Sequence, residues 1–187
     1  MLVCHDGTQT MILNLKQLNR AHLHVLRELG ALGFWSERLA QVEVLLVPFS
    51  WDCYGWQNYG SDGSICIPQL CAARVGDWWF KRKGFPLRDL LRHEWAHALA
   101  HHYPELISSR SFVRAFDGEH DGEDSFMFDP EIHVSEYAAT SPMEDFAENF
   151  MGFIKHRGRL PHQWQTPSIA KRWRFIGSLP AKMGRER

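Results

Sequence analysis

The segment 92–102 constrains this chain more than any other, because its eleven residues include four histidines and one glutamate. Its first part, His93-Glu94-Trp-Ala-His97, is the His-Glu-x-x-His pattern typical of zinc peptidases. Residues four apart in a helix lie within about 40° of each other, so the two imidazoles can share one tetrahedral ion. Glu94 lies about 100° round the helix from His93, where its carboxylate can reach a water on that ion. We therefore predict one Zn²⁺ ion held by His93 and His97, with Glu94 as the catalytic base.

The neighbouring sequence favours the helix that this pattern needs. Pro86 favours a helix start, and Tyr103-Pro104 favours a stop after His102. The side of this helix roughly opposite the two histidines is apolar and contains Leu87, Leu91, Trp95, Ala98 and Leu99. A helix with one buried side is the context in which the pattern indicates a metal site.

A catalytic zinc site usually has three protein ligands and one open position, so a third ligand is needed. His101 lies eight residues from His93, about 12 Å along a straight helix, so these two cannot reach one ion. His102 faces the apolar side or its rim. The extended metzincin pattern needs Gly at position 100 and His at position 103, where this chain has Ala and Tyr. We therefore expect the third ligand from another part of the chain.

Three acids on a second expected helix are candidates. Ser141-Pro-Met-Glu144 predicts a helix start, and Asp145 and Glu148 follow. The apolar side of this helix is predicted to contain Phe146, Phe150, Phe153 and Ile154. Glu144 has an alternative role, because Ser-x-x-Glu is a capping box in which the carboxylate accepts the backbone N–H of Ser141. Capping alone would explain Glu144 without a metal.

The positions of Tyr137, Glu144 and Glu148, together with the upstream pattern, resemble the catalytic domain of anthrax lethal factor and the related Pro-Pro endopeptidases. In that family a tyrosine precedes the ligand glutamate by seven residues, and another acid follows one helical turn later, as here. The resemblance covers roughly residues 40–156 and implies a zinc endopeptidase. It implies that Glu144 is the third ligand, that Tyr137 donates to the oxyanion, and that Glu148 supports a ligand histidine.

Two short apolar segments predict a small sheet before the metal-site helix. Residues 42–48 indicate a buried strand, and Ser64–Pro68 indicates a second strand whose final proline favours an edge position. Residues 50–63 predict a hairpin or an aromatic loop. An extended peptide could add to the expected edge strand. The predicted substrate-binding residues are therefore Ser64, Ile65, Cys66 and Ile67.

The remaining elements complete an α+β, zincin-like fold, in which a small mixed sheet has an edge strand beside the metal-site helix and a mainly helical C-terminal part follows. We expect an amphipathic helix at 15–29 with a stop at Gly30, and a last helix at 168–178. The 187 residues are expected to form one domain. From Lys155 onward there are nine Lys or Arg and one acid, so 157–187 is predicted to be a basic, solvated tail.

Composition limits the partners. The formal charge of −1 excludes the strongly basic balance of many nucleic-acid-binding proteins, so a nucleic-acid partner is not expected. The zinc pattern and the resemblance make a protein or peptide substrate the expected partner. No segment approaches the roughly 20 apolar residues of a membrane span, so no membrane partner is expected. The first residues lack the basic segment and the following apolar segment of a secretory signal peptide. A cytoplasmic location is therefore expected by default, with secretion by a non-standard route as the alternative. The oligomeric state does not follow from the sequence.

Two further groups of residues are interpreted as structural. The four cysteines are too few and too unevenly spaced for a disulfide framework, so Cys4, Cys53, Cys66 and Cys71 are expected to be reduced. The acidic segment 117–124 partly imitates a calcium loop, but Asp124 stands where an apolar residue belongs and Phe128 replaces the final glutamate. A surface loop is therefore expected there.

The sequence thus predicts hydrolysis of a peptide bond. Glu94 would take a proton from a water whose pKa the zinc lowers to about 7, and Tyr137 would stabilise the oxyanion by about 3–4 kcal/mol. One alternative is a cytoplasmic regulatory gluzincin that cleaves a repressor, which would not need Tyr137. Another is a catalytically idle, zinc-containing protein-binding module, although such a module has no need of Glu94.

Overall fold

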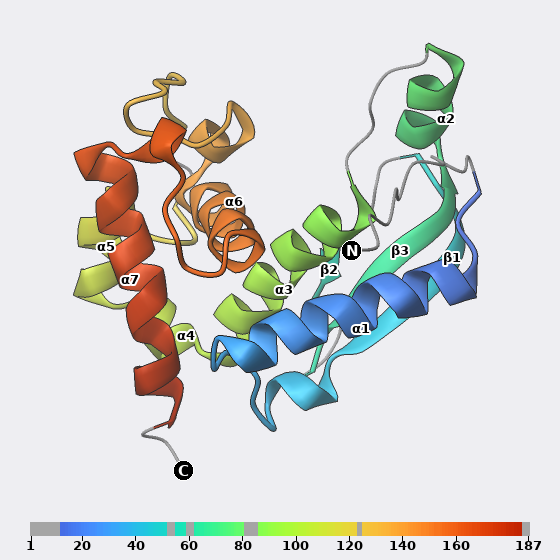
Figure 1. Cartoon of the computed structure of the whole chain (residues 1–187), viewed down its shortest axis with the longest axis horizontal. Helices are drawn as coiled ribbons and strands as arrows, with labels where there is room; N and C mark the ends of the chain where they lie inside the picture. Colours follow the sequence, from blue (N-terminus) through green and yellow to red (C-terminus); the bar gives the residue numbers. More distant parts are fainter. Residues whose placement is uncertain (1–11, 52–54, 59–61, 81–85, 123–124, 185–187) are drawn as a thin grey trace, which may run out of the picture.

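The computed structural model describes residues 12–51, 55–58, 62–80, 86–122 and 125–184 (Figure 1). The helices are α1 (Leu15–Ala31), α2 (Ala72–Trp79), α3 (Leu87–His102), α4 (Pro104–Ile107), α5 (Arg110–Phe116), α6 (Pro142–Lys155) and α7 (Pro167–Met183). The strands are β1 (Glu43–Ser50), β2 (Trp56–Gln57) and β3 (Ser64–Cys71). Three short 3-10 helices are η1 (Leu39–Gln41), η2 (Tyr137–Thr140) and η3 (His162–Trp164). The prediction of an α+β fold is confirmed.

The three strands form a small mixed sheet in the order β1-β3-β2, with β3 parallel to β1 and antiparallel to β2. The prediction that Ser64–Pro68 is an edge strand is wrong, because β3 lies in the centre. The edge strand against α3 is β2. Cys66 donates its N–H to Gly55 O at 3.1 Å, on the β2 side. Pro68 lies two residues after Cys66, so its nitrogen, which has no hydrogen to donate, faces the same side of the strand. The short strand β2 does not extend that far, so no hydrogen bond with β2 is lost and the central strand tolerates the proline.

This order also corrects the predicted substrate contacts. Ser64 and Ile65 are paired with β1 on one side and with β2 on the other. Ile65, Cys66 and Ile67 are buried. A peptide cannot add a strand alongside these residues, because their backbone groups already have partners and their side chains lie in the interior.

Helix α1 begins at a complete capping box, in which the Asn14 side chain accepts the N–H of Gln17 and the Gln17 side chain accepts the N–H of Asn14. The predicted stop at Gly30 is wrong. The helix continues to Ala31, and the chain turns at Gly33, whose φ of 79° suits a residue without a side chain.

Helix α3 lies at the centre of the molecule. Figure 1 shows α1 and the sheet on one side of it and α5, α6 and α7 on the other. Its predicted bounds are confirmed, and Trp95 is only 1% exposed in the core. The apolar side of α6 is also confirmed, since Phe146, Phe150 and Ile154 are fully buried. The core between these helices fixes α3 against α6.

The C-terminal segment is not the solvated tail that its charge predicted. Helix α7 packs on α5 and α6 and buries Ile169, Trp173 and Ile176. Even its Arg172 is buried, with its Nε 2.6 Å from Asp145 Oδ2. Lys171, Arg172, Arg174 and Lys182 therefore belong to a helix that contributes one face to the core.

The other expectations have mixed outcomes. Helices α2, α4 and α5 were not predicted, whereas segment 50–63 contains β2 within a loop. Cys66 and Cys71 lie five residues apart on β3, about 16 Å at the rise of a strand, so they cannot form a disulfide with each other. Cys4, Cys53 and Asp124 lie outside the described residues. No helix in the described ranges is long and apolar enough to cross a membrane.

Candidate metal centre

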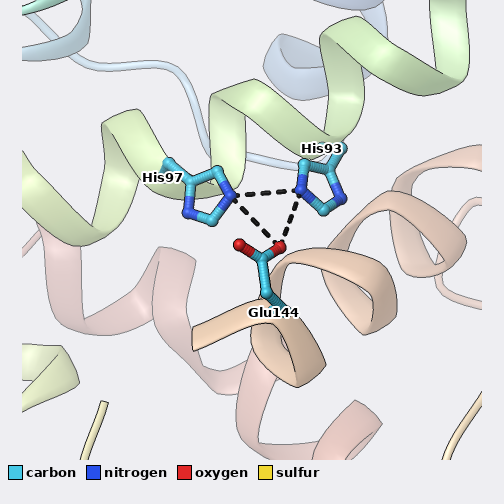
Figure 2. Close-up of side chains that lie close together, drawn as sticks. All are labelled: His93, His97 and Glu144. Atoms are coloured by element: carbon cyan, nitrogen blue, oxygen red, sulfur yellow. Dashed lines mark hydrogen bonds and ion pairs between the residues drawn. The ribbon is translucent and has the colours of Figure 1, made fainter. Parts of the chain in front are cut away.

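Helices α3 and α6 bring three ligating side chains together. Figure 2 shows His93 and His97 on α3 facing Glu144 on α6. The Glu144 Oε2 atom lies 3.1 Å from His93 Nε2 and 3.6 Å from His97 Nε2, and the two Nε2 atoms are 3.1 Å apart. The side chains of His93, His97 and Glu144 are only 8%, 10% and 13% exposed. Packing of the two helices therefore brings together residues that lie 47 positions apart.

These separations suit a metal ion. Zinc bonds to nitrogen and oxygen are about 2.0–2.2 Å long, which places tetrahedral ligand atoms about 3.3–3.6 Å apart. The observed separations of 3.1, 3.1 and 3.6 Å lie within a few tenths of that range. The contact between Glu144 Oε2 and His93 Nε2 lacks the geometry of a hydrogen bond, and this oxygen is buried without one among the described residues. His93, His97 and Glu144 could therefore hold a metal ion.

The tautomer of His93 gives a second reason. Its Nδ1 lies 2.9 Å from Glu148 Oε1, so this nitrogen carries the proton that the carboxylate accepts. When the ring is neutral, the lone pair of Nε2 therefore points toward the carboxylate of Glu144. Two sets of lone pairs at 3.1 Å repel each other unless a cation lies between them, either a proton or a metal ion.

The charges of the site also favour a bound cation. Burial by itself lowers the pKa of His93, but the carboxylates of Glu144 and Glu148 outweigh it and raise that pKa to about 10. Burial favours the neutral form of Glu144, yet its close ion-pair contacts with His93 and His97 bring its pKa below the usual range. The site therefore attracts positive charge strongly.

The structure shows which way the carboxylate of Glu144 is turned. Its backbone N–H donates to Ser141 Oγ at 3.2 Å, so Ser141 does cap α6. Its carboxylate, however, is turned toward His93 rather than back to the backbone of Ser141. The cap places the first turn of α6, and the side chain remains available as a ligand.

Glu148 lies one turn after Glu144 and is 7% exposed, so it is not on a solvated helix face. One of its oxygens, Oε1, contacts His93 Nδ1. The other, Oε2, accepts a hydrogen bond of 2.8 Å from Ser135 Oγ. A carboxylate in this position fixes the ring orientation of a ligand histidine.

Glu94 is 5% exposed and projects toward β2. Its Oε2 accepts the backbone N–H of Trp56 at 2.5 Å. In the antiparallel pair, Gly55 O faces β3, so the N–H of Trp56 faces away from the sheet, toward α3. Burial raises the pKa of Glu94, and the nearby His97 and His93 oppose this. A proton can therefore be held on this carboxylate more readily than on an exposed one.

Tyr137 lies in η2, immediately before α6, and is 52% exposed rather than buried in the core. Its ring centroid is 5.8 Å from that of His93. Burial of its hydroxyl and the negative charge of Glu144 raise the pKa of Tyr137 to about 12. The phenol therefore stays protonated at neutral pH and can donate a hydrogen bond beside the three ligating residues.

The other sequence candidates lie outside this group. His102 Nε2 contacts Asp62 O at 2.9 Å, and the ring centroid of His101 is 5.3 Å from that of Trp56. Asp145 is paired with Arg172 at 2.6 Å on another side of α6. These residues build the surroundings of the site rather than its centre.

Sequence reasoning missed Ser135 and the Gly55-Trp56 backbone. Their contacts join segments far apart in the chain, and no local pattern marks them. It also missed a cavity of about 560 Å³ beside the loop that leads to η2. Its lining includes Phe116, Phe126, Met127, Phe128, His133 and Arg172.

Comparison of the chain with models of protein families finds no match, and comparisons with curated proteins and with solved structures find none either. The resemblance to lethal factor and the Pro-Pro endopeptidases therefore rests on the motif residues.

Proposed function

We propose that this protein is a zinc-dependent endopeptidase. One observation carries the proposal: His93, His97 and Glu144 have their ligating atoms at tetrahedral spacing, and Glu94 adjoins His93 on α3. Two imidazoles and one carboxylate are a donor set used by catalytic zinc. Three ligands leave one coordination position open for water or substrate.

Each residue has a distinct part in the proposed reaction. Zinc, when bound, supplies a Lewis acid that polarises a carbonyl and makes water easier to deprotonate. Glu94 Oε2 is hydrogen-bonded to Trp56, so Oε1 is the oxygen that accepts the proton from the attacking water. Glu94 then delivers this proton to the amine that leaves when the peptide bond breaks. The Tyr137 hydroxyl donates a hydrogen bond to the oxyanion.

The experiment that tests the proposal compares the wild type with Glu94→Gln on a diverse peptide pool, with products identified by mass spectrometry. Glutamine keeps the shape of the side chain and cannot accept the proton, so this variant should keep zinc and lose cleavage. Equal cleavage by both proteins would refute the proposal. If the wild type binds zinc and leaves every peptide intact, the idle binding module becomes the better interpretation.

The ligand assignment needs a separate comparison of zinc affinities by chelator competition. Glu144→Ala removes a proposed ligand, whereas Glu148→Ala removes a carboxylate that only orients His93. Loss of the orienting carboxylate should weaken zinc binding about 10–100-fold, and loss of the ligand should weaken it more. The reverse order would show that Glu148 is the ligand.

A further inference from the structure

One serine hydroxyl connects the two halves of the proposed site. Ser135 Oγ donates to Glu148 Oε2 at 2.8 Å and accepts the backbone N–H of Ala138 at 3.0 Å. Ser135 precedes Tyr137 by two residues and belongs to the segment that leads into η2. Both hydrogen-bonding functions of the hydroxyl are therefore used, and each leads to a different functional group.

The first link leads to the metal ligands. Both oxygens of Glu148 have partners, His93 Nδ1 on Oε1 and Ser135 Oγ on Oε2. A carboxylate held at both oxygens cannot rotate about its last bond without breaking one contact. Since the Glu148 side chain is only 8% exposed, water has little access to replace the serine.

The second link leads to Tyr137. Glu136 precedes η2, and its side chain forms no capping hydrogen bond with that helix. Ser135 instead satisfies the N–H of Ala138, the residue after Tyr137. This bond helps to fix the turn that presents the half-exposed tyrosine beside His93.

We propose that Ser135 is a positioning residue that couples the orientation of His93 to the placement of Tyr137. This inference rests on the proposed function, because it assigns Ser135 to the same zinc and oxyanion site. The hydrogen bonds of Ser135 go to Glu148 and to the backbone of Ala138, so it acts through Glu148 and η2. One hydroxyl thereby holds His93, a proposed metal ligand, and Tyr137, the proposed oxyanion donor, in fixed positions relative to each other.

The test compares Ser135→Ala with Ser135→Thr and with a matched control, Ser109→Ala. Threonine keeps the hydroxyl. Ser109 Oγ also both accepts and donates, taking the N–H of Phe112 at 3.2 Å and giving its hydrogen to Leu106 O at 2.7 Å, but it lies at the start of α5. The measurements on the full chain are zinc affinity by chelator competition, kcat and KM on a cleaved peptide, and the thermal midpoint.

Ser135→Ala should weaken zinc binding about tenfold, the lower end of the range for residues that support a ligand. It should also lower kcat with little change in KM, and Ser135→Thr should restore both values. Ser109→Ala should lower the thermal midpoint about as much as Ser135→Ala does, while leaving zinc affinity and kcat unchanged. In a Glu148→Ala background, Ser135→Ala should cause no further loss of zinc affinity, because its route to His93 is already gone.

The proposal is overturned if Ser135→Ala behaves like Ser109→Ala, or if its effect on zinc affinity is undiminished in the Glu148→Ala background. The zinc measurements decide this even if the wild type cleaves no peptide, a result that would refute only the peptidase function. A wild type that binds no zinc would overturn both.

Discussion

Replacing Gly55 by alanine tests the role of Glu94, the proposed base, because Gly55 immediately precedes β2 and lies against the Glu94 carboxylate. A Cβ atom at position 55 would lie 2.1 Å from Glu94 Oε2 and 2.4 Å from both Oε1 and Cδ. No side chain fits there without moving the carboxylate, so the glycine allows the edge strand to approach α3. The same approach lets the backbone N–H of Trp56 hold Glu94 Oε2.

The expected loss of kcat follows from how far the Glu94 carboxylate must move. An ordinary contact begins at 3.4 Å, so Glu94 Oε2 must move from 2.1 Å by about 1.3 Å. The obstacle is the far end of a flexible side chain, so the fold can absorb the change at small cost in stability. Misplacement of a catalytic group by about 1 Å can lower the rate about 10²-fold. We therefore expect Gly55→Ala to lower kcat about 10²-fold and to keep zinc affinity within about threefold of the wild type.

The assay measures kcat on a peptide that the wild type cleaves, together with zinc affinity and the thermal midpoint. Gly30→Ala is the matched control, because a Cβ at position 30 meets nothing within 4 Å. Position 30 lies near the end of α1, so alanine should leave activity unchanged and raise stability by about 0.5–1 kcal/mol. Full activity in Gly55→Ala would show that the position of Glu94 seen here does not matter for the reaction.

Three further predictions concern Tyr137, His93 and Arg172. Tyr137→Phe should lower kcat about 10²–10³-fold while zinc affinity stays the same, because the hydroxyl is not a ligand; unchanged kcat would remove Tyr137 from the mechanism. In protein kept metal-free with a chelator, the pKa of His93 is raised from 6.5 to about 10, so its stabilising contribution is complete below pH 6.5 and is lost as pH rises through about 10. The thermal midpoint of that protein should therefore fall over this range, and His93→Ala should remove this part of the pH dependence. Arg172→Met should lower the free energy of unfolding in urea by about 3–5 kcal/mol, because it leaves the buried carboxylate of Asp145 without a cation beside it; a loss below about 1 kcal/mol would contradict this.

Local patterns predicted much of the fold. The bounds of α3 followed from Pro86 and Tyr103-Pro104, and the apolar side of α6 followed from its phenylalanines. These predictions succeeded because helix termini and amphipathic spacing depend on nearby residues. The predicted edge position of β3 was wrong, because strand order depends on β2, a two-residue strand without a hydrophobic pattern of its own.

The basic charge after residue 157 was misleading for a similar reason. Charge along a sequence does not report which face of a helix is buried, and α7 buries one face in the core. Arg172 lies in that face because Asp145 of α6 meets it there, which only the packing of α6 on α7 could show.

The sequence by itself determined that His93 and His97 face one point and that Glu94 lies beside them, because these residues share one helix and its period sets their directions. Tertiary structure alone decided which carboxylate joins them. Glu144 could have served only in the capping box, and packing of α6 against α3 turned its side chain toward the histidines. The contacts of Ser135 with Glu148, and of Gly55 and Trp56 with Glu94, were likewise decided by packing, since they join segments that the sequence does not relate.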